Sequence, residues 1–212
     1  LLNGQLWDGQ VAELYKNHET VDLEYINLSN GAHTMHAHLF SFQIVSRTPF
    51  NATTYLRDWT AVNGGPPPYL KVPIVMDPTP YLTGPSVPAP PQEQGFTDMV
   101  RVTKGLVTRI RIHIGPQQLA DHDEWPFDVY GGPQYVEHCH LVDHEDNEMM
   151  LRMMILSPEC QEHIYSDCDP LIPTPCCHPE QRCARHASSE CSNATEIRFR
   201  CIPSESHAVH TM

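Results

Sequence analysis

The residues best suited to metal chemistry lie in the segment YVEHCHLVDHEDNEMM, at positions 135–150. Within it, four residues separate Cys139 from His144, and four more separate His144 from Met149. A thiolate and imidazoles in a trigonal plane, with a weak thioether on the axis, are the ligands of an electron-transfer copper site. The spacing therefore predicts such a site, provided that another part of the chain supplies one more histidine.

A second segment, HTMHAH, can supply that imidazole and offers three histidines: His33, His36 and His38. Successive residues of a β-strand point to opposite faces. If Cys139 faces one metal, the adjacent His138 and His140 therefore face away from it. His36 and His38 have the same two-residue spacing and would share a face in the same way. Four imidazoles are thus available for a second metal centre, which Cys139 joins covalently to the first.

Strands must hold these ligands, because alternation with a period of two dominates the first and middle parts of the chain. The segments VDLEYINLS at 21–29 and TRIRIHI at 108–114 carry apolar residues at every second position, as half-buried strands do. Residues 62–95 contain ten of the 20 prolines and are expected to be mostly loop, with short edge strands at most. No amphipathic helix is predicted. Many short strands between glycine and proline signals indicate an all-β sandwich or barrel.

Composition and charge limit the classes of function. The chain has 212 residues and a formal net charge of −13, with 13 Lys and Arg in all. Binding to nucleic acid requires clustered Lys and Arg that neutralise phosphates, so a nucleic-acid partner is not expected. The sequence contains no apolar run long enough to cross a bilayer. Its length suits one domain of ordinary size with an appended segment.

The appended segment is marked by cysteines. Alternation stops near Leu156-Ser157-Pro158, which predicts a domain at 1–158 and a tail module at 159–212. A high density of cysteines in a short segment usually means a disulfide-stapled module in an oxidising compartment. Three bridges within the chain would leave one cysteine free or bonded to a partner chain. The tail contains seven of the eight cysteines: Cys160, Cys168, Cys176, Cys177, Cys183, Cys191 and Cys201.

Three Asn-X-Ser/Thr triplets agree with a secreted glycoprotein, and they begin at Asn27, Asn51 and Asn193. The first residues, LLNGQLWDG, carry no signal peptide and resemble the middle of a protein. We therefore expect an extracellular chain that is either processed or the C-terminal part of a longer one.

The two histidine segments also carry a family resemblance. HTMHAHLFSFQIVSR and HCHLVDHEDNEMM resemble the copper-binding signatures of the last cupredoxin domain of multicopper oxidases, in particular the bilirubin oxidase and spore-coat laccase branch. LLNGQLWDG and TDMVRVTKGLVTRIRI resemble that branch too, so the resemblance covers roughly residues 1–156. It implies a cupredoxin-like Greek-key β-sandwich.

The resemblance further implies roles for individual residues. The type 1 copper would have four ligands, the last of them axial: His33, Cys139, His144 and Met149. The type 2 copper would be bound by His36, and the type 3 pair by His38, His138 and His140. Substrate electrons would enter at His144, and Glu145 matches the acidic residue thought to help deliver protons during dioxygen reduction.

One departure from the family matters for function. The family's trinuclear cluster takes four further histidines from the first domain, as two more HxH pairs, and this chain has none. Either a separate or cleaved partner with the N-terminal domains supplies them, or the activity is absent. The favoured hypothesis is a secreted oxidase domain that passes electrons from a small reductant to O2. The alternatives are a structural or adhesive component of an extracellular assembly, and a stand-alone blue-copper carrier that would leave four histidines unexplained.

The reductant is open at this stage. Nine acidic residues and no Lys or Arg lie between Asp121 and Glu148. They either steer Fe(II), Mn(II) or a cationic organic reductant toward the copper, or form a solvated face. Trp125 and Phe127 could instead wall an apolar pocket for phenolic or other aromatic reductants.

Overall fold

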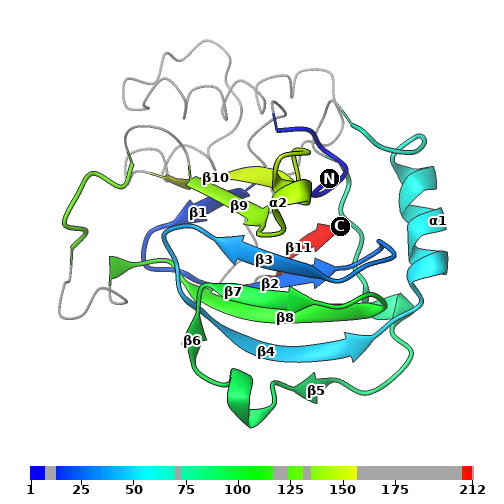
Figure 1. Cartoon of the computed structure of the whole chain (residues 1–212), viewed down its shortest axis with the longest axis horizontal. Coiled ribbons are helices and arrows are strands. Elements are labelled where there is room, and N and C mark those ends of the chain that lie inside the picture. Colours follow the sequence, from blue (N-terminus) through cyan, green and yellow to red (C-terminus); the bar gives the residue numbers. More distant parts are fainter. Residues whose placement is uncertain (8–12, 70–72, 117–123, 131–134, 157–206, 212) are drawn as a thin grey trace, which may run out of the picture.

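The structure is a computed structural model that describes residues 1–7, 13–69, 73–116, 124–130, 135–156 and 207–211, the last range by its backbone alone. The seven tail cysteines, Asn193 and the boundary predicted at 158 lie outside these residues, so the disulfides and the division at 158 stay predictions. Within the described part, two β-sheets form the body of the molecule (Figure 1).

The first sheet brings the two histidine segments together. Strand β9 is antiparallel to both of its neighbours, β10 and β3. The register aligns Cys139 with Met35 and His138 with His36. The sheet has five strands in the order β1 (Glu13–Lys16), β10 (Met150–Leu156), β9 (Tyr135–Cys139), β3 (His33–Ala37) and β7 (Met99–Val102).

The second sheet contains the two strands predicted from alternation at 21–29 and 108–114. Its order is β11 (His207–Thr211), β2 (Thr20–Ile26), β8 (Leu106–His113), β4 (Phe42–Pro49) and β5 (Val87–Pro88), with β6 (Phe96–Thr97) also paired to β4. The polar face of β2 is more buried than a half-buried strand requires. Asp22 and Glu24 are 8% and 5% exposed, because each forms an ion pair across the strands, with Arg111 and Arg109 respectively.

The core lies between the two sheets and confirms the all-β, cupredoxin-like sandwich. Alternate residues of both sheets meet there, as the strand period requires. Leu23 and Ile110 enter from the second sheet, while Met35, Cys139 and Leu151 enter from the first. In this arrangement, the inward face of β9 belongs to the core and its outward face does not.

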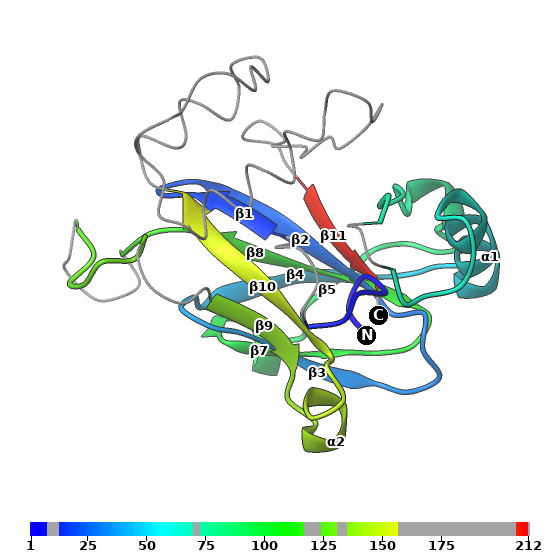
Figure 2. The ribbon, with the colours of Figure 1, turned by 90° about the horizontal axis from the view of Figure 1, so that it is seen from above.

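Helix α1 (Ala52–Val62) contradicts the expectation that the chain has no amphipathic helix. It lies beside the sandwich (Figure 2) and buries Tyr55 and Trp59, one turn apart, against a second cluster with Ile26 and Phe50. Asn51 caps it, since the Asn51 side chain accepts a hydrogen bond from the Thr54 amide. Only two residues are buried, so the apolar stripe is too narrow to stand out in the sequence.

The proline-rich segment that follows α1 has the predicted character. Its described part contains short pieces only: η1 (Thr79–Tyr81), strand β5 and η2 (Pro91–Glu93). Among the described residues, no helix combines the length and the apolar character needed to span a membrane.

Candidate metal centre

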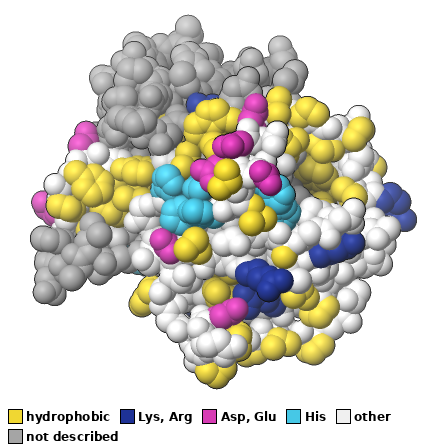
Figure 3. All heavy atoms as spheres, viewed as in Figure 1, with side chains coloured by type: hydrophobic (Ala, Val, Ile, Leu, Met, Phe, Trp, Pro, Cys, Tyr) yellow, Lys and Arg dark blue, Asp and Glu magenta, His cyan; other side chains and the backbone are white. Residues whose placement is uncertain are grey.

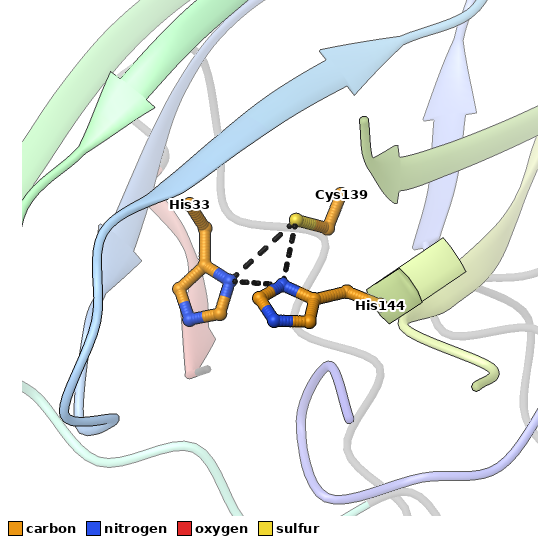
Figure 4. Close-up of side chains that lie close together, drawn as sticks. All are labelled: His33, Cys139 and His144. Atoms are coloured by element: carbon orange, nitrogen blue, oxygen red, sulfur yellow. Dashed lines mark hydrogen bonds between the residues drawn. The ribbon is translucent and has the colours of Figure 1, made fainter. Parts of the chain in front are cut away.

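Three side chains converge at one end of the sandwich, and we call them, together with Met149, the inner set. His33 comes from β3, Cys139 from the end of β9 and His144 from the short helix α2 (Val142–Glu145) (Figure 4). The Cys139 Sγ atom lies 3.5 Å from His33 Nδ1 and 3.4 Å from His144 Nδ1. The two Nδ1 atoms are 3.1 Å apart, so three donor atoms of the predicted type face one point.

This geometry suits a metal ion. Nitrogen and sulfur ligands lie about 2.0–2.3 Å from a bound ion, which places them roughly 3.3–3.8 Å from one another. Imidazoles must be neutral to bind metal. Burial and the nearby His144 lower the pKa of His33 to about 4, so its ring is neutral at physiological pH.

Met149, the predicted axial ligand, lies opposite Cys139 in the strand register. The Cys139 amide donates a hydrogen bond to the Met149 carbonyl at 3.0 Å, so the two residues face each other across β9 and the start of β10. Cross-strand partners point to the same face of a sheet. Met149 is 4% exposed and belongs to the same core cluster as Cys139. A trigonal His2Cys site with an axial methionine is the donor set of blue copper.

Four histidines lie on the opposite face of the same strands, and we call them the outer set. Ligand atoms of three of them, His36, His38 and His138, lie within 4.8 Å of one another. The Nε2 atoms of His38 and His138 are 3.2 Å apart. Burial and the neighbouring imidazoles lower the pKa of His38, which keeps it neutral as a ligand must be.

His140 joins the outer set through ring contacts. Its ring centroid lies 5.5 Å from that of His138 and 5.6 Å from that of His36. The His140 amide also donates a hydrogen bond to the Thr34 carbonyl at 2.7 Å. The structure therefore brings together every histidine predicted for the two centres, and it separates the two sets as strand alternation requires.

Comparison with known proteins agrees with this arrangement. Residues 3–159 match the family described as multicopper oxidase. The chain belongs to the multicopper oxidase family. It is 34% identical over 158 residues to a laccase of Bacillus subtilis (strain 168), covering 74% of this chain and 24% of that protein. It is 30% identical over 156 residues to multicopper oxidase LPR1 of Arabidopsis thaliana, covering 74% of this chain and 26% of that one.

Among solved structures, the McoA multicopper oxidase of Aquifex aeolicus is 21% identical to this chain, with a TM-score of 0.43. The match covers 70% of this chain and 22% of McoA. The chain spans about a quarter of the length of the curated multicopper oxidases that it matches.

In this multicopper oxidase chain, protein groups hold the second ring nitrogen of several histidines. His33 Nε2 lies 2.7 Å from Ser29 Oγ, and His36 Nδ1 lies 2.9 Å from the Asp98 carbonyl. His138 Nδ1 lies 3.3 Å from the Cys139 carbonyl. Such contacts orient metal ligands and fix their tautomers. Sequence reasoning missed Ser29 and Asp98; the signal for Ser29 was a hydroxyl residue four positions before His33.

Ser29 was interpreted instead as part of a glycosylation triplet that begins at Asn27. Asn27 is fully buried, and its side-chain amide donates hydrogen bonds to the Gly31 and Val102 carbonyls. The Asn27 side chain is therefore inaccessible to a glycan, and the interpretation of this triplet as a surface glycan acceptor is wrong. Asn51 is exposed and caps α1.

Acidic side chains lie around the histidines on the molecular surface (Figure 3). Glu145 Oε2 lies 3.4 Å from His138 Nδ1, and Glu148 Oε2 accepts a hydrogen bond from the Trp7 amide. Glu137, counted with the acidic stretch in the sequence, is instead buried in the core. Burial raises the pKa of Glu137 to about 7, and a hydrogen bond with Tyr25 opposes part of this increase.

Trp125 does not form the apolar wall that was considered for aromatic reductants. Its Nε1–H group donates to Asn17 Oδ1 at 3.0 Å, and Asn17 follows the end of β1. Strands β1 and β10 are parallel, with Lys16 beside Leu156, which is six residues and about 20 Å along β10 from Met150. Phe127 packs against Trp125, so both aromatic residues lie at the end of the sandwich away from the multicopper oxidase ligands.

Proposed function

We propose that this chain is the copper-binding domain of an oxidase that transfers electrons from a small reductant to O2. The observation that carries the proposal is the placement of two ligand sets on opposite faces of one strand, with Cys139 bonded directly to His138 and His140. Copper, when bound, would supply one-electron transfer at the inner set and reduction of O2 to water at the outer set.

The residues of the inner set would hold one copper and present it to the reductant. His33, Cys139 and His144 supply the trigonal donors, and Met149 the axial one. His33 is 6% exposed, whereas His144 is only partly buried. The more accessible imidazole, that of His144, is therefore the edge at which a reductant would make contact.

The residues of the outer set would hold the second centre. By family resemblance His36 would bind the type 2 copper, and three histidines the type 3 pair: His38, His138 and His140. Glu145 would carry protons, since its carboxylate is 36% exposed to solvent and its Oε2 atom lies 3.4 Å from His138 Nδ1. It can therefore exchange protons with water and hold them beside the outer set.

The outer set needs further histidines, which we propose come from N-terminal multicopper oxidase domains. These domains would belong to a longer form of the protein, to a cleaved segment or to a separate chain. The cysteine-rich tail would provide a disulfide link to a partner in an extracellular location. Both a phenolic or other organic reductant and a metal ion are compatible with the exposed edge of His144 and the acidic surroundings.

The proposal is tested by electron paramagnetic resonance of the natively purified protein, with copper quantified per chain. We expect type 1 and type 2 signals together when the N-terminal domains are present. If only the type 1 signal appeared with those domains present, the chain would be an electron carrier that does not reduce O2. Absence of both signals in copper-replete protein would overturn the proposal in favour of a structural or adhesive component.

A further inference from the structure

The loop that leads into β3 contains a closed hydrogen-bond network directly behind His33. Its members are Asn27, Ser29 and Gly31, and it ends at the Nε2 atom of His33, on the side of the ring away from Cys139. A network with this position can decide which ring nitrogen of His33 carries the proton.

The orientation of the Asn27 amide is fixed by its partners. The Nδ2 group lies 2.8 Å from the Gly31 carbonyl and 3.1 Å from the Val102 carbonyl. Both partners are acceptors, so the two protons of Nδ2 are used on them. The Oδ1 atom consequently faces Ser29, and it accepts a hydrogen bond from the Ser29 amide at 2.9 Å.

The single proton of the Ser29 hydroxyl is then committed to an acceptor. Ser29 Oγ lies 2.8 Å from Asn27 Oδ1 and 3.2 Å from the Gly31 carbonyl, and neither atom has a proton to give. The Gly31 amide also donates a hydrogen bond to Oγ, at 3.3 Å. The hydroxyl has one proton and two lone pairs, so with its proton donated to an acceptor oxygen the 2.7 Å contact to His33 Nε2 is one in which Oγ accepts. His33 therefore carries its proton on Nε2, and the lone pair of Nδ1 faces Cys139 Sγ.

We propose that Ser29, held by Asn27, is a positioning residue that fixes the Nε2–H tautomer of His33 and so prepares Nδ1 for a metal ion. This inference rests on the proposed metal-binding role of the inner set. It assigns the Asn27-Leu28-Ser29 triplet a function inside the fold.

The first test needs neither metal nor a variant. Nitrogen-15 chemical shifts of the His33 ring, measured in the metal-free full chain at neutral pH, should show a protonated Nε2 and an unprotonated Nδ1. A predominant Nδ1–H tautomer would overturn the proposal.

The second test compares Ser29→Ala with two matched variants. Ser29→Thr retains the hydroxyl, and Asn30→Ala changes the same loop at a residue whose side chain contacts Lys104. We expect Ser29→Ala to mix the His33 tautomers and to weaken Cu(II) binding about 10- to 100-fold, the usual cost of losing such a partner. The intense visible absorption of Cys139-bound Cu(II) should also broaden in Ser29→Ala. Ser29→Thr should restore both properties, and Asn30→Ala should change neither.

The outcomes separate this inference from the proposed function. Wild-type chain that shows the Nε2–H tautomer but binds no copper would contradict the oxidase proposal and leave the positioning of His33 intact. Wild-type chain that binds copper as expected, with Ser29→Ala unchanged in both tautomer and affinity, would overturn the role of Ser29 alone. Thermal unfolding of each metal-free variant identifies any loss that results from misfolding.

Discussion

The two faces of strand β9 hold the two sets of candidate ligands in different surroundings. On the inward face, Cys139 meets its partners in the core, where Cys139 and Met149 are 0% and 4% exposed. On the outward face, His138 is 4% exposed and lies beside three further histidines, of which His140 is exposed. The core encloses the inner set, whereas the outer set reaches the molecular surface. A single strand can therefore place one candidate ligand set in the core and another at the surface, separated by one peptide unit.

The largest effect is expected for Cys139→Ser, because the thiolate is the one sulfur donor in the trigonal plane. The variant should lose the intense blue absorption of the copper-loaded chain completely, since a serine oxygen cannot replace the copper–thiolate bond. Visible absorption of copper-loaded protein measures this directly. His113→Ala is the matched control, because His113 lies on β8 and contacts Thr20, remote from both sets. Blue colour in the serine variant would contradict the assignment of the inner set.

The next effect separates the two faces. His36→Ala should leave the blue absorption unchanged, because His36 points away from Cys139. Turnover of O2 by the chain together with the N-terminal domains should fall by more than about 100-fold. Loss of a group that only orients a ligand already costs up to about 100-fold, and His36 would be a ligand itself. Oxygen consumption and the type 2 resonance signal measure this loss. Equal loss of the inner and outer signals would show that the two sets are not independent.

The burial of Glu137 on the inward face of β9 predicts a pH effect on stability. The folded-state pKa of Glu137 is raised from 4.5 to about 7, so its neutral form is favoured in the fold. This contribution is fully present below pH 4.5, is lost progressively as the pH rises to about 7, and is worth about 3 kcal/mol in total.

Glu137→Gln should remove that pH dependence, because an amide of the same shape does not titrate. Urea unfolding of the metal-free chain at pH 5 and at pH 8 tests it, with wild type measured in parallel. Burial also raises the pKa of the neighbouring Glu13, so some decrease in stability with pH should persist in the variant. Identical pH profiles for the two proteins would contradict an uncharged Glu137.

The smallest effect is expected for Asp98→Ala. The Asp98 carboxylate lies 3.8 Å from His36 and is 55% exposed, whereas its backbone carbonyl makes the 2.9 Å contact with the ring. Stability should change by less than about 0.5 kcal/mol, as for most surface substitutions, and copper binding should not change. Thermal unfolding and copper titration check this. A loss comparable to that of Ser29→Ala would mean that the carboxylate, and not the backbone, holds His36.

Much of the site could be predicted from the sequence because it depends on local periodicity. The HxH spacing at the end of β3 places two histidines on one face, and the HCH triplet at the end of β9 places Cys139 on the face opposite to its two histidines. The groups that hold those ligands depend on long-range register instead. Asn27 reaches the Val102 carbonyl, 75 residues away, and the Asn27 triplet alone is indistinguishable from a glycan acceptor.

The fold follows the same division. Strands β2 and β8 could be predicted from alternation, but the burial of Asp22 and Glu24 results from arginines that face them on the neighbouring strand. Helix α1 escaped prediction because two aromatic residues provide its whole buried face. The interior carboxyl of Glu137 escaped it because a charged residue on a strand is ordinarily assigned to the solvent face.

The connection from β9 through α2 to Met149 has a consequence for the unfolded chain. Cys139, His144 and Met149 lie within eleven consecutive residues, whereas His33 is 106 residues from Cys139. A denatured chain therefore keeps three of the four inner donors on one short loop, whose closure costs little chain entropy. Copper bound there would stabilise the native state only by the additional affinity that His33 provides, because a ligand that also binds the unfolded chain contributes less to stability. Loading the chain with copper would therefore raise its free energy of unfolding by less than the affinity of the folded site implies.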